Sequence, residues 1–77
     1  MKYERGVSLT DHRLIAACST RALQDAEASG GRTYRAEYEG GESRTFAVAS
    51  AEHARVYAAE YGARIIGARV ESVRWAR

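Results

Sequence analysis

The sequence predicts an α+β fold: an N-terminal helix followed by a ββαβ unit whose three-stranded antiparallel sheet carries helices packed on one face. Two runs of alternating apolar and polar residues flank Gly40-Gly41, which is typical of a β-hairpin. Apolar residues at helical spacing precede and follow this hairpin, and a last alternating run comes after them. The chain has 77 residues and no proline, so we expect residues 1–77 to form a single domain.

The first helix is expected over residues 10–29. Thr10 is a suitable N-cap, Asp11 places a negative charge in the first turn, and Gly30-Gly31 supplies the left-handed residue that ends many helices. Residues 1–9 are expected to form an arm or a short edge strand. The apolar side of this helix consists of Leu14, Ile15, Cys18, Ala22 and Ala26.

The hairpin is expected over residues 32–49, and the length of its loop decides its register. A two-residue turn at Gly40-Gly41 would split the apolar residues between the two faces, whereas a three-residue loop that also includes Glu42 keeps them together. The longer loop pairs Tyr34 with Val48 and Ala36 with Phe46. The buried face then consists of Tyr34, Ala36, Tyr38, Phe46 and Val48, and the opposite face of Thr33, Arg35, Glu37, Ser43 and Thr45.

A second helix is expected over residues 50–66, with Ser50 as its N-cap and Gly67 at its end. Val56 lies on the side that we expect to be exposed. The inner side consists of Ala51, Ala54, Tyr57, Ala58, Tyr61 and Ile65.

The last strand is expected over residues 68–76. Simple alternation cannot place Val70, Val73 and Trp75 on one face, because the spacing from Val70 to Val73 is odd. Either a bulge near Glu71-Ser72 or burial on both faces would resolve this conflict.

Composition limits the classes of function. Cys18 is the only cysteine, which excludes an internal disulfide and fits a reducing compartment, so we expect a cytoplasmic protein. No segment approaches the roughly 20 apolar residues of a membrane helix, and the first residues lack the apolar core of a signal peptide. The formal net charge is +2, and all basic residues except Lys2 are arginine, which suits either an arginine-rich interface or a genome rich in G and C.

Catalytic and metal-binding readings find little support in the residues. His12 and His53 are the only imidazoles, and a metal site would need both of them together with carboxylates from distant segments. Cys18 falls on the apolar side of the first helix, where a thiol is inert. We therefore expect no catalytic site, no metal and no cofactor.

Binding residues are expected on the polar face of the sheet and near the C-terminus. An antiparallel sheet covered on one face leaves the other face available to a partner. Trp75 stands beside Arg74, so it either anchors a partner within a charged rim or closes the core. The candidate partner-binding residues are Arg35, Glu37, Thr45, Arg69, Arg74 and Trp75.

The run from Arg32 to Trp75 contains a glycine-tipped hairpin, a serine-capped helix rich in alanine and tyrosine, and a final strand. In size and layout it resembles the small phage and prophage proteins that inhibit type I CRISPR–Cas systems. The resemblance implies a non-enzymatic protein in the host bacterial cytoplasm. Such a protein binds a Cas subunit or the surveillance complex and blocks target-DNA access or nuclease recruitment.

A small nucleic-acid-binding regulatory protein is the alternative function. Acidic residues are interspersed among the arginines, so we expect direct nucleic-acid binding to be weak or absent. The two functions differ in their salt dependence, because affinity that depends on phosphate contacts falls steeply with salt.

Overall fold

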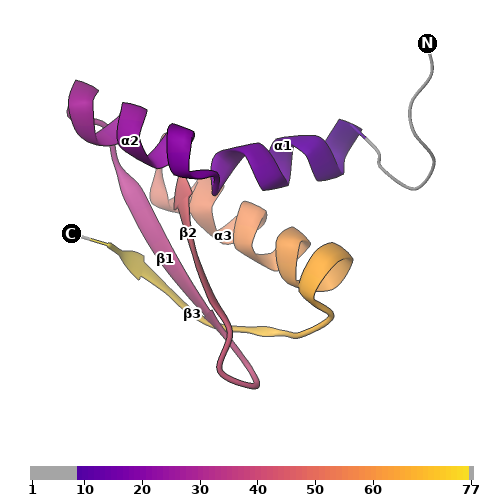
Figure 1. Ribbon diagram of the computed structural model, residues 1–77. Helices are drawn as coiled ribbons and strands as arrows, with labels where there is room; N and C mark the ends of the chain where they lie inside the picture. Colours follow the sequence, from indigo (N-terminus) through magenta and orange to yellow (C-terminus); the bar gives the residue numbers. More distant parts are fainter. Residues whose placement is uncertain (1–8, 77) are drawn as a thin grey trace, which may run out of the picture.

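The computed structural model describes residues 9–76 of the chain, and the side chains of residues 11–76. It has the α+β fold that the sequence predicts, with two N-terminal helices followed by a ββαβ unit (Figure 1). The elements are α1 (Leu9–Ala17), α2 (Thr20–Ser29), β1 (Thr33–Tyr38), β2 (Ser43–Ala47), α3 (Ala51–Tyr61), the π-helical turn η1 (Gly62–Ile66) and β3 (Val70–Trp75).

The N-terminal helical segment is divided in two, so the prediction of one helix over residues 10–29 is wrong. The amides of Cys18 and Ser19 donate to carbonyl oxygens three residues earlier, which tightens and ends α1. The Ser19 hydroxyl then accepts the Ala22 amide at 3.1 Å and caps α2, which ends as predicted at Gly30 in the left-handed conformation. Because α1 already includes Leu9, Thr10 is not its N-cap, and the arm or edge strand predicted for residues 1–9 otherwise lies outside the described residues.

β1 is the central strand of the sheet, which has the order β2-β1-β3 and is antiparallel throughout. The hairpin loop has the predicted length of three residues, but it consists of residues 39–41 and not of residues 40–42. The Tyr38 amide donates to the Glu42 carbonyl oxygen at 2.8 Å and so closes the loop one residue earlier. Gly40 and Gly41 both have positive φ, a conformation that glycine adopts easily, and this favours a loop that contains both of them. Tyr34 therefore pairs with Phe46, and the predicted pairing is wrong by two residues. A shift of two leaves every side chain on its predicted face.

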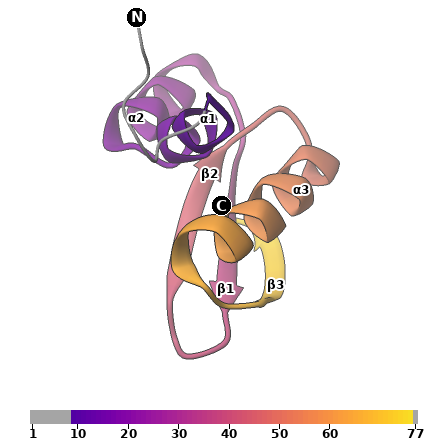
Figure 2. The same cartoon turned by 90° about the vertical axis from the view of Figure 1, so that its right-hand side faces the viewer.

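The core lies between the sheet and the helices α1 and α3. Figures 1 and 2 show α3 along one side of the sheet, with α1 and α2 across one end. The Tyr38 hydroxyl, deep in this core, donates to the Ala58 carbonyl oxygen at 2.7 Å, and Phe46 meets the Tyr61 ring edge-on at 5.4 Å. Val48 is only half-buried. The buried residues are Leu14, Tyr34, Ala36, Tyr38, Phe46, Ala54, Ala58 and Tyr61.

Ile15 was expected on the buried side of the first helix and is 48% exposed. Among the described side chains of α1, at residues 11–17, Leu14 alone is buried, while Cys18 lies half-buried at the helix break. The predicted apolar side assumes one continuous helix, and the break after α1 removes that continuity. Ile15 is not among the residues that pack against the core.

The second helical segment begins and ends as the sequence predicts. Ser50 caps α3 by accepting the His53 amide, and Gly67 ends the segment with a φ of 81°. The last turn is π-helical rather than α-helical, and the wider turn rotates the side chains that follow it. Ile66 consequently packs against the core, whereas Ile65, predicted on the inner side, is exposed. Ala51 is also exposed, and Val56 is exposed as predicted.

Gly62 lies where α3 passes into the π-helical turn. A Cβ atom at this position would stand 2.5 Å from the Ala68 carbonyl oxygen and 2.7 Å from a ring carbon of Tyr38. Only glycine therefore allows the turn to approach the buried Tyr38 ring so closely.

The final strand contains the predicted bulge. Tyr38 pairs with Val70 and Glu37 with Ser72, so Glu71 is an extra residue without a partner in β1. The bulge places Val70, Val73 and Trp75 on the α3 side of the sheet.

Candidate partner-binding surface

The side of the sheet turned away from α3, called the open face below, forms a small and regular grid. Its rows cross β2, β1 and β3, and their positions follow from the strand pairings and from the Ala76 amide, which donates to the Thr33 carbonyl oxygen. α2 borders the row of Thr33 through Leu23 and Glu27. The three rows are Ala47, Thr33 and Ala76; Thr45, Arg35 and Arg74; and Ser43, Glu37 and Ser72.

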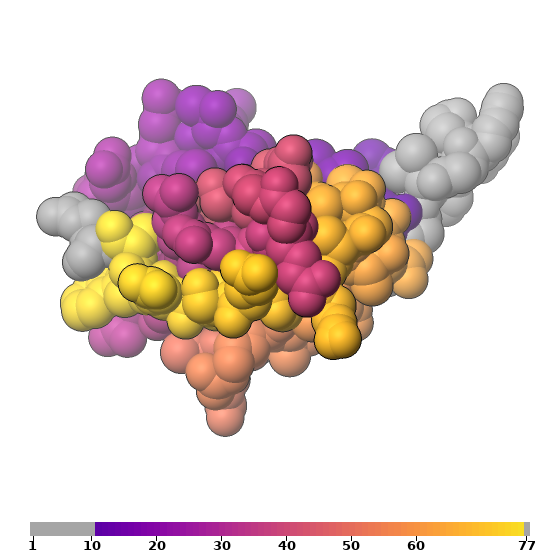
Figure 3. All heavy atoms as spheres, turned by 90° about the horizontal axis from the view of Figure 1, so that it is seen from below, coloured from indigo at the N-terminus to yellow at the C-terminus, as the bar shows by residue number. Residues whose placement is uncertain are grey.

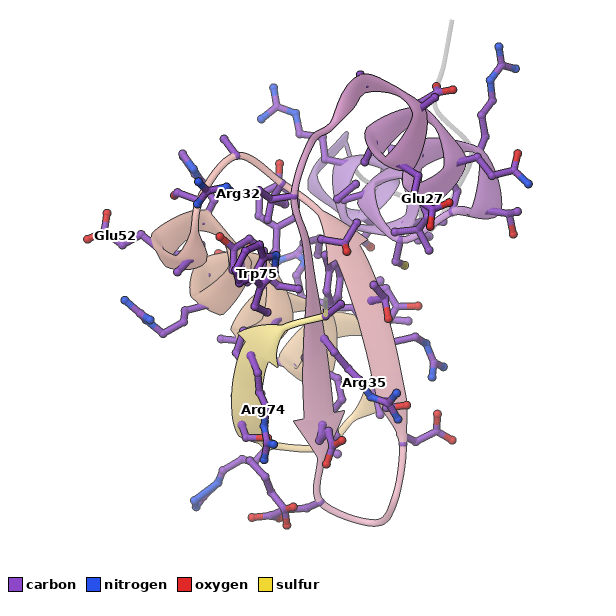
Figure 4. The ribbon with its side chains drawn as sticks, turned by 90° about the vertical axis from the view of Figure 1, so that its left-hand side faces the viewer. Glu27, Arg32, Arg35, Glu52, Arg74 and Trp75 are labelled. Carbon is purple, nitrogen blue, oxygen red and sulfur yellow. The ribbon has the colours of Figure 1, made fainter. Side chains whose placement is uncertain are left out.

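Two guanidinium groups dominate the central row of the open face. Arg35 lies directly opposite Arg74 across the β1–β3 ladder, and both side chains are exposed (Figure 4). Arg35 contacts Glu37 at 3.4 Å and donates to the Ser43 hydroxyl at 3.3 Å. No hydrogen bond or ion pair of the Arg74 side chain is found among the described residues. Like charges directly opposite each other in a sheet repel, and an anionic group placed between them would offset this repulsion.

Small side chains surround the two arginines. Apart from the three charged residues, every grid position holds alanine, serine or threonine. Figure 3 shows the hairpin and β3 side by side on the surface of the molecule. The open face is therefore polar, and a hollow of about 220 Å³ at its hairpin end is lined by Arg35, Glu37 and Ser43 together with residues of the loop. Such an open surface suits contact with another macromolecule better than enclosure of a small ligand.

Trp75 lies on the other face from its neighbour Arg74. Its position opposite Tyr34 places it on the α3 side, where its side chain is 62% exposed. The Arg32 guanidinium stands 5.9 Å from the centre of the indole ring, a distance that allows a cation–π contact (Figure 4). Trp75 therefore does not close the core, which removes one of the two readings that the sequence left open.

Arg69 occupies a third location, just before β3. Its carbonyl oxygen accepts the Glu39 amide at 2.9 Å, and Arg69 lines a shallow groove of about 640 Å³ with residues of α3 and η1. Other residues of this groove are Glu39, Ala59, Ala63, Gly67, Ala68 and Val70.

The six candidate residues are thus divided between three places. Four of them, Arg35, Glu37, Thr45 and Arg74, share the open face, whereas Trp75 and Arg69 do not belong to it.

Sequence reasoning missed Arg32, Ala59 and Ala63. Arg32 stands two residues before Tyr34 and so shares the face of Trp75, a relation that becomes visible only when the bulge is placed. The alanines line a groove whose wall depends on the π-helical turn, for which the sequence carries no recognised signal.

The shifted pKa values belong to groups with structural contacts. Burial raises the pKa of Tyr38 to about 12, and its hydroxyl is committed to the Ala58 carbonyl oxygen. Hydrogen bonds to the Tyr61 hydroxyl and to Glu42 raise the pKa of Arg44 above its ordinary value. Both groups are therefore held by hydrogen bonds within the fold.

Within residues 9–76, no three histidine, cysteine or acidic side chains come together in a way that could hold a metal ion. None of the helices in this part of the chain has the length and apolar character that crossing a bilayer requires.

Comparison of the chain with protein-family models, with curated proteins and with solved structures found no match.

Proposed function

We propose that the protein is a non-enzymatic binding protein that docks the open face of its sheet onto an acidic surface of a partner protein. One observation carries the proposal: Arg35 and Arg74 lie directly opposite each other in the β1–β3 ladder, and both are exposed at the centre of a face of small residues. A carboxylate of the partner would relieve the repulsion between the two cations and accept the forked hydrogen bonds that arginine offers.

The surrounding residues support contact with a macromolecule. Alanine, serine and threonine side chains allow close approach of a partner's surface, and the serine and threonine hydroxyl groups can either donate or accept hydrogen bonds. Glu37 adds a negative charge beside the arginines, so the face discriminates between partners by the position of their charges.

The most specific form of the proposal is an inhibitor of a type I CRISPR–Cas effector in the host bacterial cytoplasm. The resemblance in size and layout over Arg32–Trp75 supports it. Here the open face would cover a Cas subunit or the assembled surveillance complex and so block target-DNA access or nuclease recruitment.

The test is a CRISPR interference assay with the variants Arg35→Ala and Arg74→Ala. Truncating a binding hot spot costs at least about 2 kcal/mol, which corresponds to roughly thirtyfold in affinity, so inhibition should weaken accordingly. Arg55→Ala, at an exposed position of α3, is the matched control and should keep full activity. Circular dichroism checks that each variant is folded. Full inhibition by both open-face variants would contradict the proposal.

A nucleic-acid-binding regulator is the second candidate, because two neighbouring arginines can also bind a phosphate. The open face, however, carries no aromatic side chain on which a base could stack. We expect non-specific DNA affinity of about 10⁻⁴–10⁻⁶ M at physiological salt. A sub-micromolar, sequence-selective complex with duplex DNA, measured by fluorescence anisotropy, would favour the regulator.

A further inference from the structure

The outer edge of β3 has unpaired backbone groups. In the order β2-β1-β3, no described strand pairs with this edge. The Ala76 amide points toward β1, since it donates to the Thr33 carbonyl oxygen, and antiparallel alternation then directs the backbone groups of Val73 and Trp75 outward. The bulge is confined to Glu71, so Ser72–Trp75 is a regular segment on which another strand can pair.

Two neighbouring residues at this edge present a charged side chain on one face of the sheet and an aromatic side chain on the other. Arg74 presents a cation on the open face, and Trp75 presents a largely exposed indole on the α3 side. A strand paired with β3 would bring alternate side chains to the two faces, so one set would meet Arg74 and the other would meet Trp75.

The groove beside the start of β3 continues the apolar side of this edge. Ala59 of α3 and Ala63 of η1 face Val70 across it, and these small side chains leave room for apolar groups of a ligand. Val70 and Trp75 lie on the same face of β3. An extended ligand can therefore place apolar side chains both in the groove and against the indole.

We propose that β3 binds an extended segment of the partner protein as a fourth, antiparallel strand. In this segment, acidic side chains face Arg74 and alternate with apolar side chains that face Trp75 and the groove. The inference rests on the proposed function, since it specifies how the protein partner binds. The charge of Arg74 favours an acidic segment over a second copy of β3, which would bring a second Arg74 to the same edge.

The test uses the acetylated and amidated octapeptide EVEVEVEV and follows the fluorescence of Trp75, the only tryptophan of the chain. A peptide of the same composition in the order EEEEVVVV is the matched control. We expect the alternating peptide to bind at least tenfold more tightly, to change the Trp75 emission, and to lose about tenfold in affinity for the variant Arg74→Ala. Equal affinity of the two peptides would overturn the proposal.

N-methylation of the peptide tests the backbone pairing directly. In an antiparallel fourth strand, the valine amides lie opposite Val73 and Trp75 and donate to β3, whereas the glutamate amides point to solvent. Methylating two central valine amides should weaken binding at least tenfold, and methylating two central glutamate amides should leave it unchanged. Equal effects of both peptides would overturn strand addition.

The outcomes separate this inference from the proposed function. If no peptide binds but Arg35→Ala and Arg74→Ala still weaken inhibition, strand addition is wrong and the open face stands. If the alternating peptide binds with the expected methylation pattern while both variants inhibit fully, the edge binds a strand and the proposed function is wrong. Sedimentation measures whether the protein forms a concentration-dependent dimer. If it does, and if the peptide dissociates the dimer, the edge of β3 binds a second copy of the chain and the proposal of an acidic partner segment is wrong.

Discussion

The two faces of the sheet are built from the same strands, yet they differ in what holds their residues in place. On the α3 side, Tyr38 and Phe46 are almost fully buried, and each contacts a helix through a specific atom or ring. On the open face, Arg35 and Arg74 are exposed and lie among small side chains. Changes on the first face must disturb packing, whereas the second face can change its charge with little cost to the fold.

Phe46→Ala should give the largest effect. Removing a fully buried ring that packs against Tyr61 leaves a cavity and should lower the free energy of unfolding by about 3–5 kcal/mol, enough to unfold much of so small a domain. Urea denaturation followed by circular dichroism measures the loss. Thr45→Ala, on the opposite face of the same strand, is the control and should change stability by less than about 0.5 kcal/mol. Similar losses in both variants would break the distinction between the faces.

Gly62→Ala should have the second-largest effect, because the new methyl group would collide with the Ala68 carbonyl oxygen and the Tyr38 ring. Overpacking of this kind costs about 1–3 kcal/mol. The midpoint of urea denaturation measures the change. Ala63→Gly, at the next position, which is exposed, is the control for a change between glycine and alanine that involves no collision. An unchanged midpoint for Gly62→Ala would show that the contact of residue 62 with Ala68 and Tyr38 is not tight.

Tyr38→Phe should cost about 1 kcal/mol at neutral pH, through loss of the hydrogen bond to the Ala58 carbonyl oxygen. The pKa of Tyr38 in the folded protein is about 12, against 10.0 for its ordinary value, so the unfolded chain loses this proton first as pH rises. The stability that the neutral hydroxyl contributes is therefore complete below pH 10 and decreases between pH 10 and about 12.

Stability measured in urea across this pH range should fall less steeply for Tyr38→Phe than for the natural chain. Parallel pH profiles would contradict the assignment of the raised pKa to Tyr38.

Arg74→Ala should have the smallest effect on stability, within about 0.5 kcal/mol of the natural chain. Because it removes a like charge opposite Arg35, the change should be neutral or slightly stabilising at low salt. Thermal unfolding at two salt concentrations measures it. A loss of more than about 1 kcal/mol would show that the open face supports the fold and would blur the difference between the faces.

The alternation of apolar residues was sufficient to predict the buried face of the hairpin, because side-chain direction depends only on whether a register shift is odd or even. The exact pairing of Tyr34 with Phe46 depends on which residues form the turn, and a two-residue shift leaves the apolar pattern unchanged. The helix break at Ser19 was missed because Leu14, Cys18 and Ala22 keep one helical spacing across it. The Ser19 cap thus ends the first helix and begins a second one, although the apolar spacing continues across the break.

The candidate surface was predictable within one hairpin and not beyond it. Arg35, Glu37 and Thr45 were grouped correctly because alternation places them on one face. Trp75 was predicted among the same binding residues, but its face depends on the bulge. The extra residue Glu71 places Trp75 on the other face of the sheet. Arg69 precedes the strand, where alternation carries no information about direction.

The bulge at Glu71 decides which kind of chemistry the open face shows. If Glu71 paired with Glu37 and were not bulged, the pairing of Tyr38 with Val70 would continue in step and bring Trp75 opposite Thr33, on the same face as Arg35. An indole and a guanidinium on an exposed antiparallel sheet would then form a platform for unstacked bases. The single bulged residue thus determines that the indole of Trp75 lies on the opposite face of the sheet from Arg35 and Arg74.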